Sequence, residues 1–425
     1  MADGFPVARA REVEVVTFGC RLNAYESGAI AARAAADKIE DAVVFNTCAV
    51  TGEAVRQARQ AIRKAARERP GARLIVTGCA AQIDPAAFAD LPGVDLVLGN
   101  AEKSAPGAML RSGVQVADIM TLRPAAAPAG GLTERSRAYV EIQNGCDHRC
   151  TFCVIPFGRG NSRSTPPEII IERVRALAEQ GYREVVLTGV DLTSWGADLP
   201  DTPVVGDLVA RILAETPGLA RLRLSSIDAA EIDEALMEVL AYEPRLMPHL
   251  HLSLQSGDDL ILKRMKRRHS RAQALALIGR VRAARPDTAF GADFIAGFPT
   301  ETEAAFANTL GFVEEAGLAY LHVFPYSARP GTPAARMPKV EPAVVKERAA
   351  RLRAAGALAL ARHLDRTTGR TVRALVEKPG LARAEDFSEI VFDGDLSPGT
   401  LIEGTVAGHD GRLAKLEHWR AVSWP

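Results

Sequence analysis

This sequence of 425 residues lacks long apolar runs, internal repeats and low-complexity tracts. No uninterrupted apolar stretch reaches the roughly 18 residues of a spanning helix, so we expect no membrane segment. The start of the chain lacks a basic segment followed by an apolar run, so we expect no secretory signal. Lys plus Arg and Asp plus Glu balance at 52 each, so the net charge indicates no particular partner. We therefore expect a cytoplasmic protein.

Cysteine is scarce, with only six residues in the chain. An even number permits three disulfides, but a chain of this length with 47% apolar residues needs no covalent staples. We therefore expect reduced cysteines that serve as structural thiols or as metal ligands. At roughly 100–200 residues per domain, the length indicates two to four domains.

The first part of the chain alternates predicted strands and helices, which is typical of an open, mostly parallel α/β sheet. The predicted strands are Glu12–Phe18, Ala42–Asn46, Arg73–Thr77 and Asp95–Leu98, with a helix over Gly52–Arg69. Cys20, Cys48 and Cys79 each follow one of the first three strands. Since such sheets bind ligands at the carboxyl edge of their strands, we expect the three cysteines to converge there. The alternative is three separate buried thiols.

The rest of the chain shows two further patterns. A Pro-, Ala- and Gly-rich stretch at 123–132 predicts a linker after a first domain of residues 1–122. Over 133–365, six strands each precede a helix-like stretch, which predicts a partial (β/α)6 barrel of the TIM type. The six predicted strands are Ala138–Gln143, Glu184–Thr188, Arg221–Ser225, His249–Leu254, Phe290–Ala296 and Tyr320–Tyr326. Over 366–425, short strand-like runs between turns predict a small β-barrel.

Cys146, Cys150 and Cys153 form a C-x3-C-x2-C motif directly after the first barrel strand. Three thiolates on one tight loop can bind three irons of a [4Fe–4S] cluster and leave the fourth iron open. A structural zinc site would need four protein ligands, and His148 is the alternative fourth. It lies inside the loop and would have to fold back past two cysteines, so the spacing favours an iron–sulfur cluster.

This motif, followed by βα units, resembles the radical SAM superfamily. The resemblance implies that the open iron binds S-adenosylmethionine (SAM) through its amino and carboxyl groups. It also implies reductive cleavage of SAM to a 5′-deoxyadenosyl radical, which abstracts hydrogen from an unactivated carbon. The residues that match SAM contacts of the superfamily are Phe152, Gly189, Asp191, Ser225, Ser226, Gln255 and Gly291. Their alternative roles are local packing, turns and close backbone approach.

Nearly the whole chain resembles the radical SAM methylthiotransferases, which combine a three-cysteine α/β domain, the barrel and a small C-terminal TRAM domain. The resemblance implies that Cys20, Cys48 and Cys79 hold a second, auxiliary [4Fe–4S] cluster. It also implies that one SAM methylates a sulfur and a second SAM supplies the radical. The expected partners are tRNA, a flavodoxin- or ferredoxin-type electron donor and a sulfur donor. We expect the protein to act as a monomer.

Two stretches, Gly19–Ser27 and Tyr139–Ser164, resemble the branch that acts on N6-threonylcarbamoyladenosine at tRNA position 37. At the positions of Arg21 and Leu22, the branch acting on isopentenyladenosine usually carries Gln-Met, and the branch acting on a ribosomal-protein aspartate usually carries Pro-Lys. These two substrates remain the alternatives within the family. The alternative of another class is a noncatalytic metal- and RNA-binding protein, which the βα units disfavour.

Local charge gives mixed support for a tRNA partner. The stretch Lys263–Arg285 holds nine Lys or Arg and no acid, and Arg56, Arg59, Arg63 and Arg67 are spaced to share one helix face. Such patches either neutralise phosphates or form a solvated surface. Residues 366–425 carry eight Lys or Arg against nine Asp or Glu, so binding there would need one basic face. The candidates for it are Arg366, Arg370 and Arg373.

Overall fold

The computed structural model describes residues 13–122 and 136–424, which form two compact units. The first unit comprises residues 13–122 together with 154–161, and the second comprises 136–153 and 162–424. Residues 154–161 follow Cys153 directly and yet pack within the first unit. The predicted linker at 123–132 lies outside the described residues.

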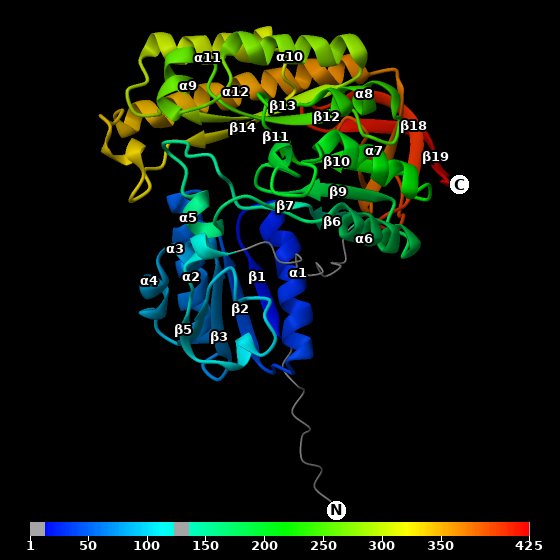
Figure 1. The fold of residues 1–425 in the computed structure, drawn as a ribbon. Helices are drawn as coiled ribbons and strands as arrows, with labels where there is room; N and C mark the ends of the chain where they lie inside the picture. Colours follow the sequence, from blue (N-terminus) through cyan, green and yellow to red (C-terminus); the bar gives the residue numbers. More distant parts are fainter. Residues whose placement is uncertain (1–12, 123–135, 425) are drawn as a thin grey trace, which may run out of the picture. The chain divides into compact units, whose positions relative to one another are not determined.

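The first unit contains a parallel sheet in the order β1-β2-β3-β4-β5 (Figure 1). Its strands are β1 (Glu14–Thr17), β2 (Ala42–Thr47), β3 (Arg73–Gly78), β4 (Val94–Leu98) and β5 (Gly113–Gln115). Its helices are α1 (Arg21–Ala36), α2 (Gly52–Glu68), α3 (Cys79–Ile83), α4 (Pro85–Ala89) and α5 (Ile155–Arg159), with 3-10 turns η1 (Ala108–Leu110) and η2 (Ile119–Thr121). The predicted α/β sheet is therefore confirmed, and β5 extends it by one short strand.

Both faces of this sheet are buried. Successive side chains of a strand point to opposite faces, and the two faces accordingly carry separate apolar clusters. Val43 and Phe45 of β2 belong to one cluster, whereas Val44 of the same strand belongs to the other. Such two-sided burial explains why the strands read as continuous apolar runs rather than as alternating patterns.

The second unit begins with the predicted partial barrel, whose strands form a three-stranded sheet (β10-β9-β6) and a four-stranded sheet (β11-β12-β13-β14). The strands are β6 (Ala138–Glu141), β9 (Glu184–Thr188), β10 (Arg221–Leu224), β11 (Ser226–Ile227), β12 (His249–Gln255), β13 (Ala289–Ala296) and β14 (Tyr320–Pro325). The chain passes from one sheet to the other at Ser225, between β10 and β11. A small hairpin, β7 (Gln143–Asn144) with β8 (Arg163–Ser164), flanks the cysteine motif.

Helices cover the outer side of these strands, as Figure 1 shows for β12–β14 beneath α9–α12. They are α6 (Pro167–Glu179), α7 (Val205–Glu215), α8 (Glu234–Tyr242), α9 (Asp259–Met265), α10 (Arg271–Ala284), α11 (Glu303–Glu315) and α12 (Pro342–Thr367), with 3-10 turns η3 (Leu192–Ser194) and η4 (Pro333–Arg336). One large apolar cluster fills the space between strands and helices. No helix within residues 13–122 and 136–424 has the length and apolar character that a membrane span requires.

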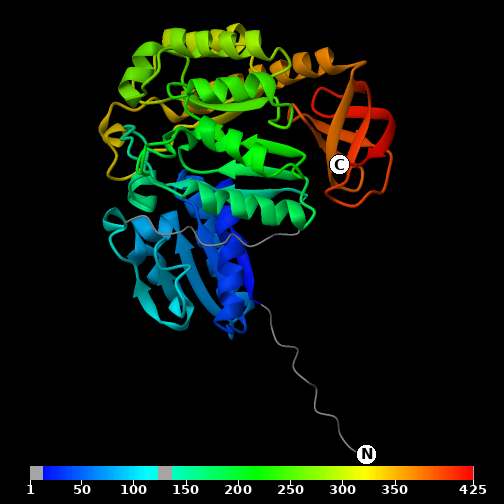
Figure 2. The same ribbon diagram turned by 45° about the vertical axis from the view of Figure 1, so that its right-hand side comes forward.

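Helix α12 leads into a closed five-stranded barrel, which stands at its end in Figure 2. Its strands are β15 (Thr371–Lys378), β16 (Leu381–Ala384), β17 (Glu389–Phe392), β18 (Leu401–His409) and β19 (Ala414–Val422). This small barrel contacts the amino-terminal ends of the larger barrel's strands: Arg223 on β10 donates to the carbonyl oxygens of Ala384 at 2.6 Å and Glu385 at 2.8 Å. The carboxyl ends of the strands remain as the edge for binding.

Candidate metal and cofactor sites

The first unit brings Cys20, Cys48 and Cys79 together at one edge of its sheet. Cys20 precedes α1, Cys48 follows β2, and Cys79 begins α3 directly after β3. Gly19 shows how closely the chain approaches there, because a Cβ atom at this residue would lie 2.5 Å from Cys48 Sγ. A side chain at position 19 would occupy the space of the thiol, so glycine is required beside this cluster of cysteines.

Burial dominates the electrostatics of these thiols. It raises the pKa of Cys48 to about 12, and the neighbouring Cys79 and Cys20 add to the effect. Burial also raises the pKa of Cys79. All three cysteines are free. Metal binding therefore has to displace protons from this site, as is usual for thiolate ligands.

A buried group of charges lies beside these cysteines. Arg159 of α5 donates to Glu26 at 2.9 and 3.0 Å and to Asn23 Oδ1 at 2.6 Å, and Lys103 Nζ lies 2.8 Å from the same carboxylate. All four side chains are buried. One carboxylate thus faces two cations, and the excess positive charge calls for an anion. A cluster bound by three thiolates is a net anion in its oxidised form, so the residues fit an auxiliary iron–sulfur cluster.

The second three-cysteine loop lies in the second unit, where backbone contacts of Thr151 hold it in place. Its N–H donates to the carbonyl of Met265 at 3.0 Å, and its own carbonyl accepts from Ala334 N–H at 2.9 Å. Cys146, Cys150 and Cys153 are all partly exposed and form no disulfide. The motif places three thiols on one short loop, and this donor set fits a cluster with one open iron.

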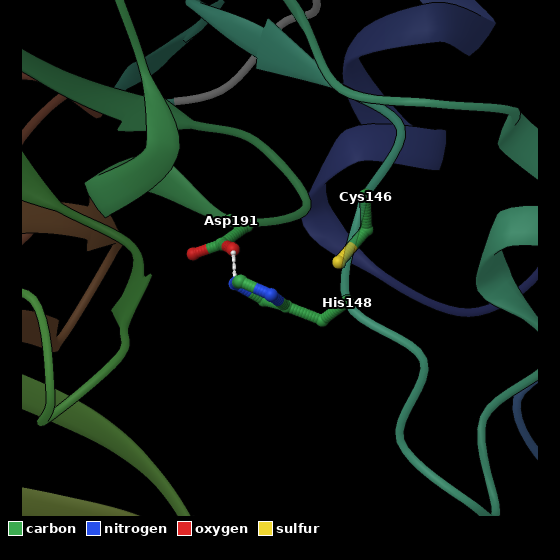
Figure 3. Close-up of side chains that lie close together, drawn as sticks. All are labelled: Cys146, His148 and Asp191. Carbon is green, nitrogen blue, oxygen red and sulfur yellow. Dashed lines mark ion pairs between the residues drawn. The ribbon is translucent and has the colours of Figure 1, made fainter. Parts of the chain in front are cut away.

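Two charged side chains touch this loop. Arg267 lies with Nη1 3.7 Å from Cys150 Sγ, and it also donates to Asp228 at 2.8 Å. His148 lies with Nε2 2.7 Å from Asp191 Oδ2, beside Cys146 (Figure 3). Hydrogen bonding to Asp191 and then to Glu231 raises the pKa of His148 to about 9.

These pairings bear on the zinc alternative. Cys146, His148 and Asp191 place one potential ligand atom each within 4.8 Å of one another. However, Nε2 of His148 lies 2.7 Å from Asp191 Oδ2, so this nitrogen faces the carboxylate. This pairing favours the iron–sulfur cluster over the zinc site.

The predicted SAM contacts at the first two strand ends surround a polar backbone turn. Gly189 and Asp191 follow β9, and the N–H groups of Val190 and Asp191 donate to Gln143 Oε1 at 3.0 and 2.9 Å. Ser225 is buried, and its Oγ has no hydrogen-bond partner in the described part of the chain. An unsatisfied buried hydroxyl at a strand end fits a polar ligand such as SAM.

Among the remaining predicted contacts, Phe152 and Gly291 have neighbours that explain their positions by packing. Ser226 lies partly exposed on β11, and Gln255 ends β12 with a positive φ of 74°. Phe152 packs edge-on against Phe298, with ring centroids 6.4 Å apart. Gly291 on β13 faces the His251 ring. Contacts of these four residues with SAM stay predictions.

Sequence reasoning did not identify several of these residues, namely Glu26, Lys103, Arg159, Asp228 and Arg267. Three of them lie within stretches that the sequence analysis names, but their partners lie far away along the chain, so the sequence does not reveal the pairs. The basic stretch Lys263–Arg285 is not a row of unpaired cations that would be available to phosphates. Most of its arginines bond within the unit, for example Arg268 to Glu231 and Arg280 to Glu234.

Two family profiles match the sequence. The one described as "Radical SAM superfamily" matches residues 140–313, and the one described as "Uncharacterized protein family UPF0004" matches residues 12–99. The first match contains the C-x3-C-x2-C motif, and the second contains the three early cysteines.

Curated relatives match over much longer stretches. A protein of Rickettsia prowazekii named "Threonylcarbamoyladenosine tRNA methylthiotransferase MtaB" is 48% identical over 398 residues, covering 93% of this chain and 94% of the relative. A Bacillus subtilis protein of the same name is 38% identical and covers 79% and 78%. An Erythrobacter litoralis protein named "tRNA-2-methylthio-N(6)-dimethylallyladenosine synthase" is 35% identical and covers 94% and 95%.

Among solved structures, the radical S-adenosylmethionine methyltransferase TsrM of Kitasatospora setae is similar with a TM-score of 0.52. The match covers 74% of this chain and 68% of that one at 16% identity. At this identity the likeness concerns the fold alone.

Proposed function

This chain belongs to the radical SAM methylthiotransferase family, and we propose that it converts N6-threonylcarbamoyladenosine at tRNA position 37 to the 2-methylthio derivative. As a radical SAM enzyme it uses a [4Fe–4S] cluster and SAM. The observation that carries the substrate is the 48% identity over 93% of the chain with a relative named for that nucleoside. Arg21 and Leu22 agree with the same branch, although Leu22 is buried and therefore marks the branch without contacting a substrate.

The six cysteines divide between two clusters in this proposal. Cys146, Cys150 and Cys153 hold the radical SAM cluster, and Cys20, Cys48 and Cys79 hold the auxiliary one. When bound, the clusters and SAM supply the radical that removes hydrogen from the base and the methylthio group that replaces it. The buried cations of the first unit support the second assignment, because they neutralise an anionic cluster.

Other side chains orient these groups. Arg267 holds the loop at Cys150, and Gln143 fixes the backbone of Val190 and Asp191 where the amino group of SAM is expected. Ser225 offers a buried hydroxyl to the same ligand. Phe152, Gly189, Ser226, Gln255 and Gly291 complete the set of proposed SAM contacts.

The proposed partners are tRNA, a flavodoxin- or ferredoxin-type electron donor and a sulfur donor. The proposed location is the cytoplasm, and the proposed oligomeric state is a monomer. We assign residues 1–122 to the auxiliary-cluster domain, 133–365 to the radical SAM barrel and 366–425 to a TRAM domain that contributes to tRNA binding. Arg366 and Arg370 line a cavity of about 510 Å³ and suit phosphates, whereas Arg373 is paired with Glu403 at 2.9 Å.

Mass spectrometry of tRNA nucleosides tests the proposal. We expect 2-methylthio-N6-threonylcarbamoyladenosine to vanish from cells that lack the gene and to return on complementation. An unchanged level of this nucleoside would refute the substrate. The isopentenyladenosine derivatives would be measured in the same samples, because the Erythrobacter litoralis relative is named for a dimethylallyladenosine product.

A further inference from the structure

One side-chain amide of the first unit lies between a cysteine of the auxiliary site and the buried charges beside it. Asn100 follows the end of β4 by two residues, and its Nδ2 lies 3.8 Å from Cys79 Sγ. The same nitrogen donates to the carbonyl of Gly158 at 2.6 Å, and Oδ1 accepts from Lys103 Nζ at 2.7 Å. All four residues belong to the first unit. Asn100 thus joins a cysteine, helix α5 and a buried lysine.

The partners of Asn100 determine which side of its amide faces the cysteine. The ammonium group of Lys103 can only donate, so the atom that it contacts is the amide oxygen. The carbonyl of Gly158 can only accept, so the atom beside it is the amide nitrogen. This nitrogen carries two hydrogens, and Gly158 takes one of them. The other hydrogen is available to Cys79 Sγ, so a donor faces this sulfur.

Further contacts hold the amide and the sulfur at this separation. The backbone N–H of Asn100 donates to Gln82 Oε1 at 2.8 Å, and Gln82 belongs to α3, the helix that Cys79 begins. Helix α5 packs against α3 (Figure 1). A Cβ atom on Gly158 would lie only 3.1 Å from Cys79 Cβ, so the two helices approach closely at the cysteine. Asn100 is therefore held from both its backbone and its side chain.

The other two cysteines of the auxiliary site have different neighbours. Cys48 Sγ accepts from the backbone N–H of Val50 at 3.5 Å. The side-chain atom that lies 3.9 Å from Cys20 Sγ is Oδ1 of Asn23, and a carbonyl oxygen can only accept. The donor at Cys79 differs from both, because it belongs to a side chain. A single substitution of Asn100 can therefore remove it.

A donor at this sulfur acts on the charge of a bound cluster. When Cys79 binds iron as a thiolate, its sulfur is an acceptor, and the negative charge on it increases when the cluster gains an electron. Hydrogen bonds to charged acceptors are stronger than those to neutral ones. The amide of Asn100 should therefore stabilise the reduced cluster more than the oxidised cluster. Hydrogen bonds to the sulfurs are among the factors that set the reduction potential of iron–sulfur clusters.

We propose that Asn100 is a positioning residue of the auxiliary cluster, which donates to the Cys79 sulfur and thereby raises the reduction potential of the cluster. The inference rests on the proposed function, because it requires an iron–sulfur cluster on Cys20, Cys48 and Cys79. Asn100 acts on this cluster through one of its ligands, and Lys103 and Gly158 hold the amide in place.

The test uses the full chain with Cys146, Cys150 and Cys153 replaced by alanine, so that only the auxiliary cluster is reconstituted. The cluster is titrated with reductant and followed by electron paramagnetic resonance. Asn100→Ala removes one hydrogen bond to a charged group. At a fixed potential, we expect the ratio of reduced to oxidised cluster to fall about tenfold, which corresponds to a midpoint shift of about 59 mV to lower values.

Asn100→Asp has nearly the shape of the natural side chain and keeps an acceptor for Lys103, but it turns an acceptor towards the sulfur. The ratio of reduced to oxidised cluster should therefore fall further than in Asn100→Ala. Gln57→Ala is the matched control, because the amide of Gln57 is exposed on α2 and donates to Glu53 at 2.9 Å. Its removal should leave both the iron content and the potential unchanged.

The iron content separates the proposal from a merely structural role, which would lower the iron bound per chain and leave the potential of the remaining cluster unchanged. A fall of less than about threefold, or a rise, in an Asn100 variant that binds iron would overturn the proposal while the proposed function stands. Loss of iron from both Asn100 variants would show a role in assembly instead and would also overturn it. If the parent chain with Asn100 intact binds no iron, the auxiliary cluster of the proposed function is itself refuted.

Discussion

Replacement of Arg159 by glutamine should lower the reduction potential of the auxiliary cluster. Arg159 is buried on α5 and bonds to Glu26 and Asn23. A nearby cation stabilises the reduced cluster, which carries one more electron than the oxidised form. Glutamine retains a donor for Asn23 but removes the charge, and Lys103 remains paired with Glu26. The apoprotein should therefore still fold.

The distances set the size of the effect. Asn23 Oδ1 lies 3.9 Å from Cys20 Sγ and 2.6 Å from Arg159 Nη2, so the guanidinium lies within about 6.5 Å of that sulfur. At this separation and an effective dielectric constant of about 20, one charge is worth about 2.5 kcal/mol. For a one-electron couple this corresponds to about 100 mV. Glu26→Gln removes a negative charge from the same network and should shift the potential in the opposite direction.

The assay is a redox titration followed by electron paramagnetic resonance. Cys146, Cys150 and Cys153 are first replaced by alanine, so that only the auxiliary cluster is present. Arg63→Gln is the control, because Arg63 is exposed on α2 and water screens its charge. A change of less than about 20 mV for the Arg159 variant, or an upward shift, would refute the electrostatic reasoning.

Three further results are expected. Cys150→Ala should abolish formation of 5′-deoxyadenosine and retain the auxiliary cluster, and any remaining 5′-deoxyadenosine would contradict the assignment of the radical cluster. Cys48→Ala should still cleave SAM but yield no methylthio product, as nucleoside mass spectrometry would report; normal product would remove the auxiliary cluster from the reaction. Burial raises the pKa of Glu184, but the charges of Arg223, Arg221 and Arg137 outweigh this effect. Together they lower the pKa of Glu184 to about 2. Glu184→Gln should therefore cost about 3–5 kcal/mol in urea unfolding at neutral pH. Because the pKa of Glu184 is depressed in the folded state, this stabilisation is present above about pH 4.5 and is lost as the pH falls towards 2. The free energies of unfolding of the wild type and the variant should therefore converge near pH 2.

The sequence predicted the fold well where elements are long and apolar. Glu184–Thr188 has the predicted bounds, and most other predicted strands differ by one or two residues. The strands β5, β8, β11 and β16 were missed, because each has only two to four residues and no repeated pattern. Ser225 was predicted as the last residue of a strand, but it lies between β10 and β11, where the chain changes sheets.

Some residues of the candidate sites could be predicted from the sequence, and others could not. The cysteines are visible in the sequence because spacing and strand ends mark them locally. Arg159 and Glu26 are 133 residues apart, so only the folded chain brings them together. The contacts of His251 and His322 with Asp293 had a weak signal, the alternation of polar and apolar residues in His249–Gln255. That alternation indicates that the polar side chains of β12 share one face, but it does not name the partners on β13 and β14.

The positive charges of this protein indicate a bound anion only where the side chains of the same unit do not already balance them. The stretch Lys263–Arg285 is the most basic part of the sequence, yet its arginines mainly bond to acids and carbonyls of their own unit. Arg159 and Lys103 share the carboxylate of Glu26, so this buried group of three side chains carries more positive than negative charge. A buried excess charge is costly unless a ligand balances it. The cations that point to a bound anion are therefore the buried ones that share one carboxylate, and not those in the most basic stretch of the sequence.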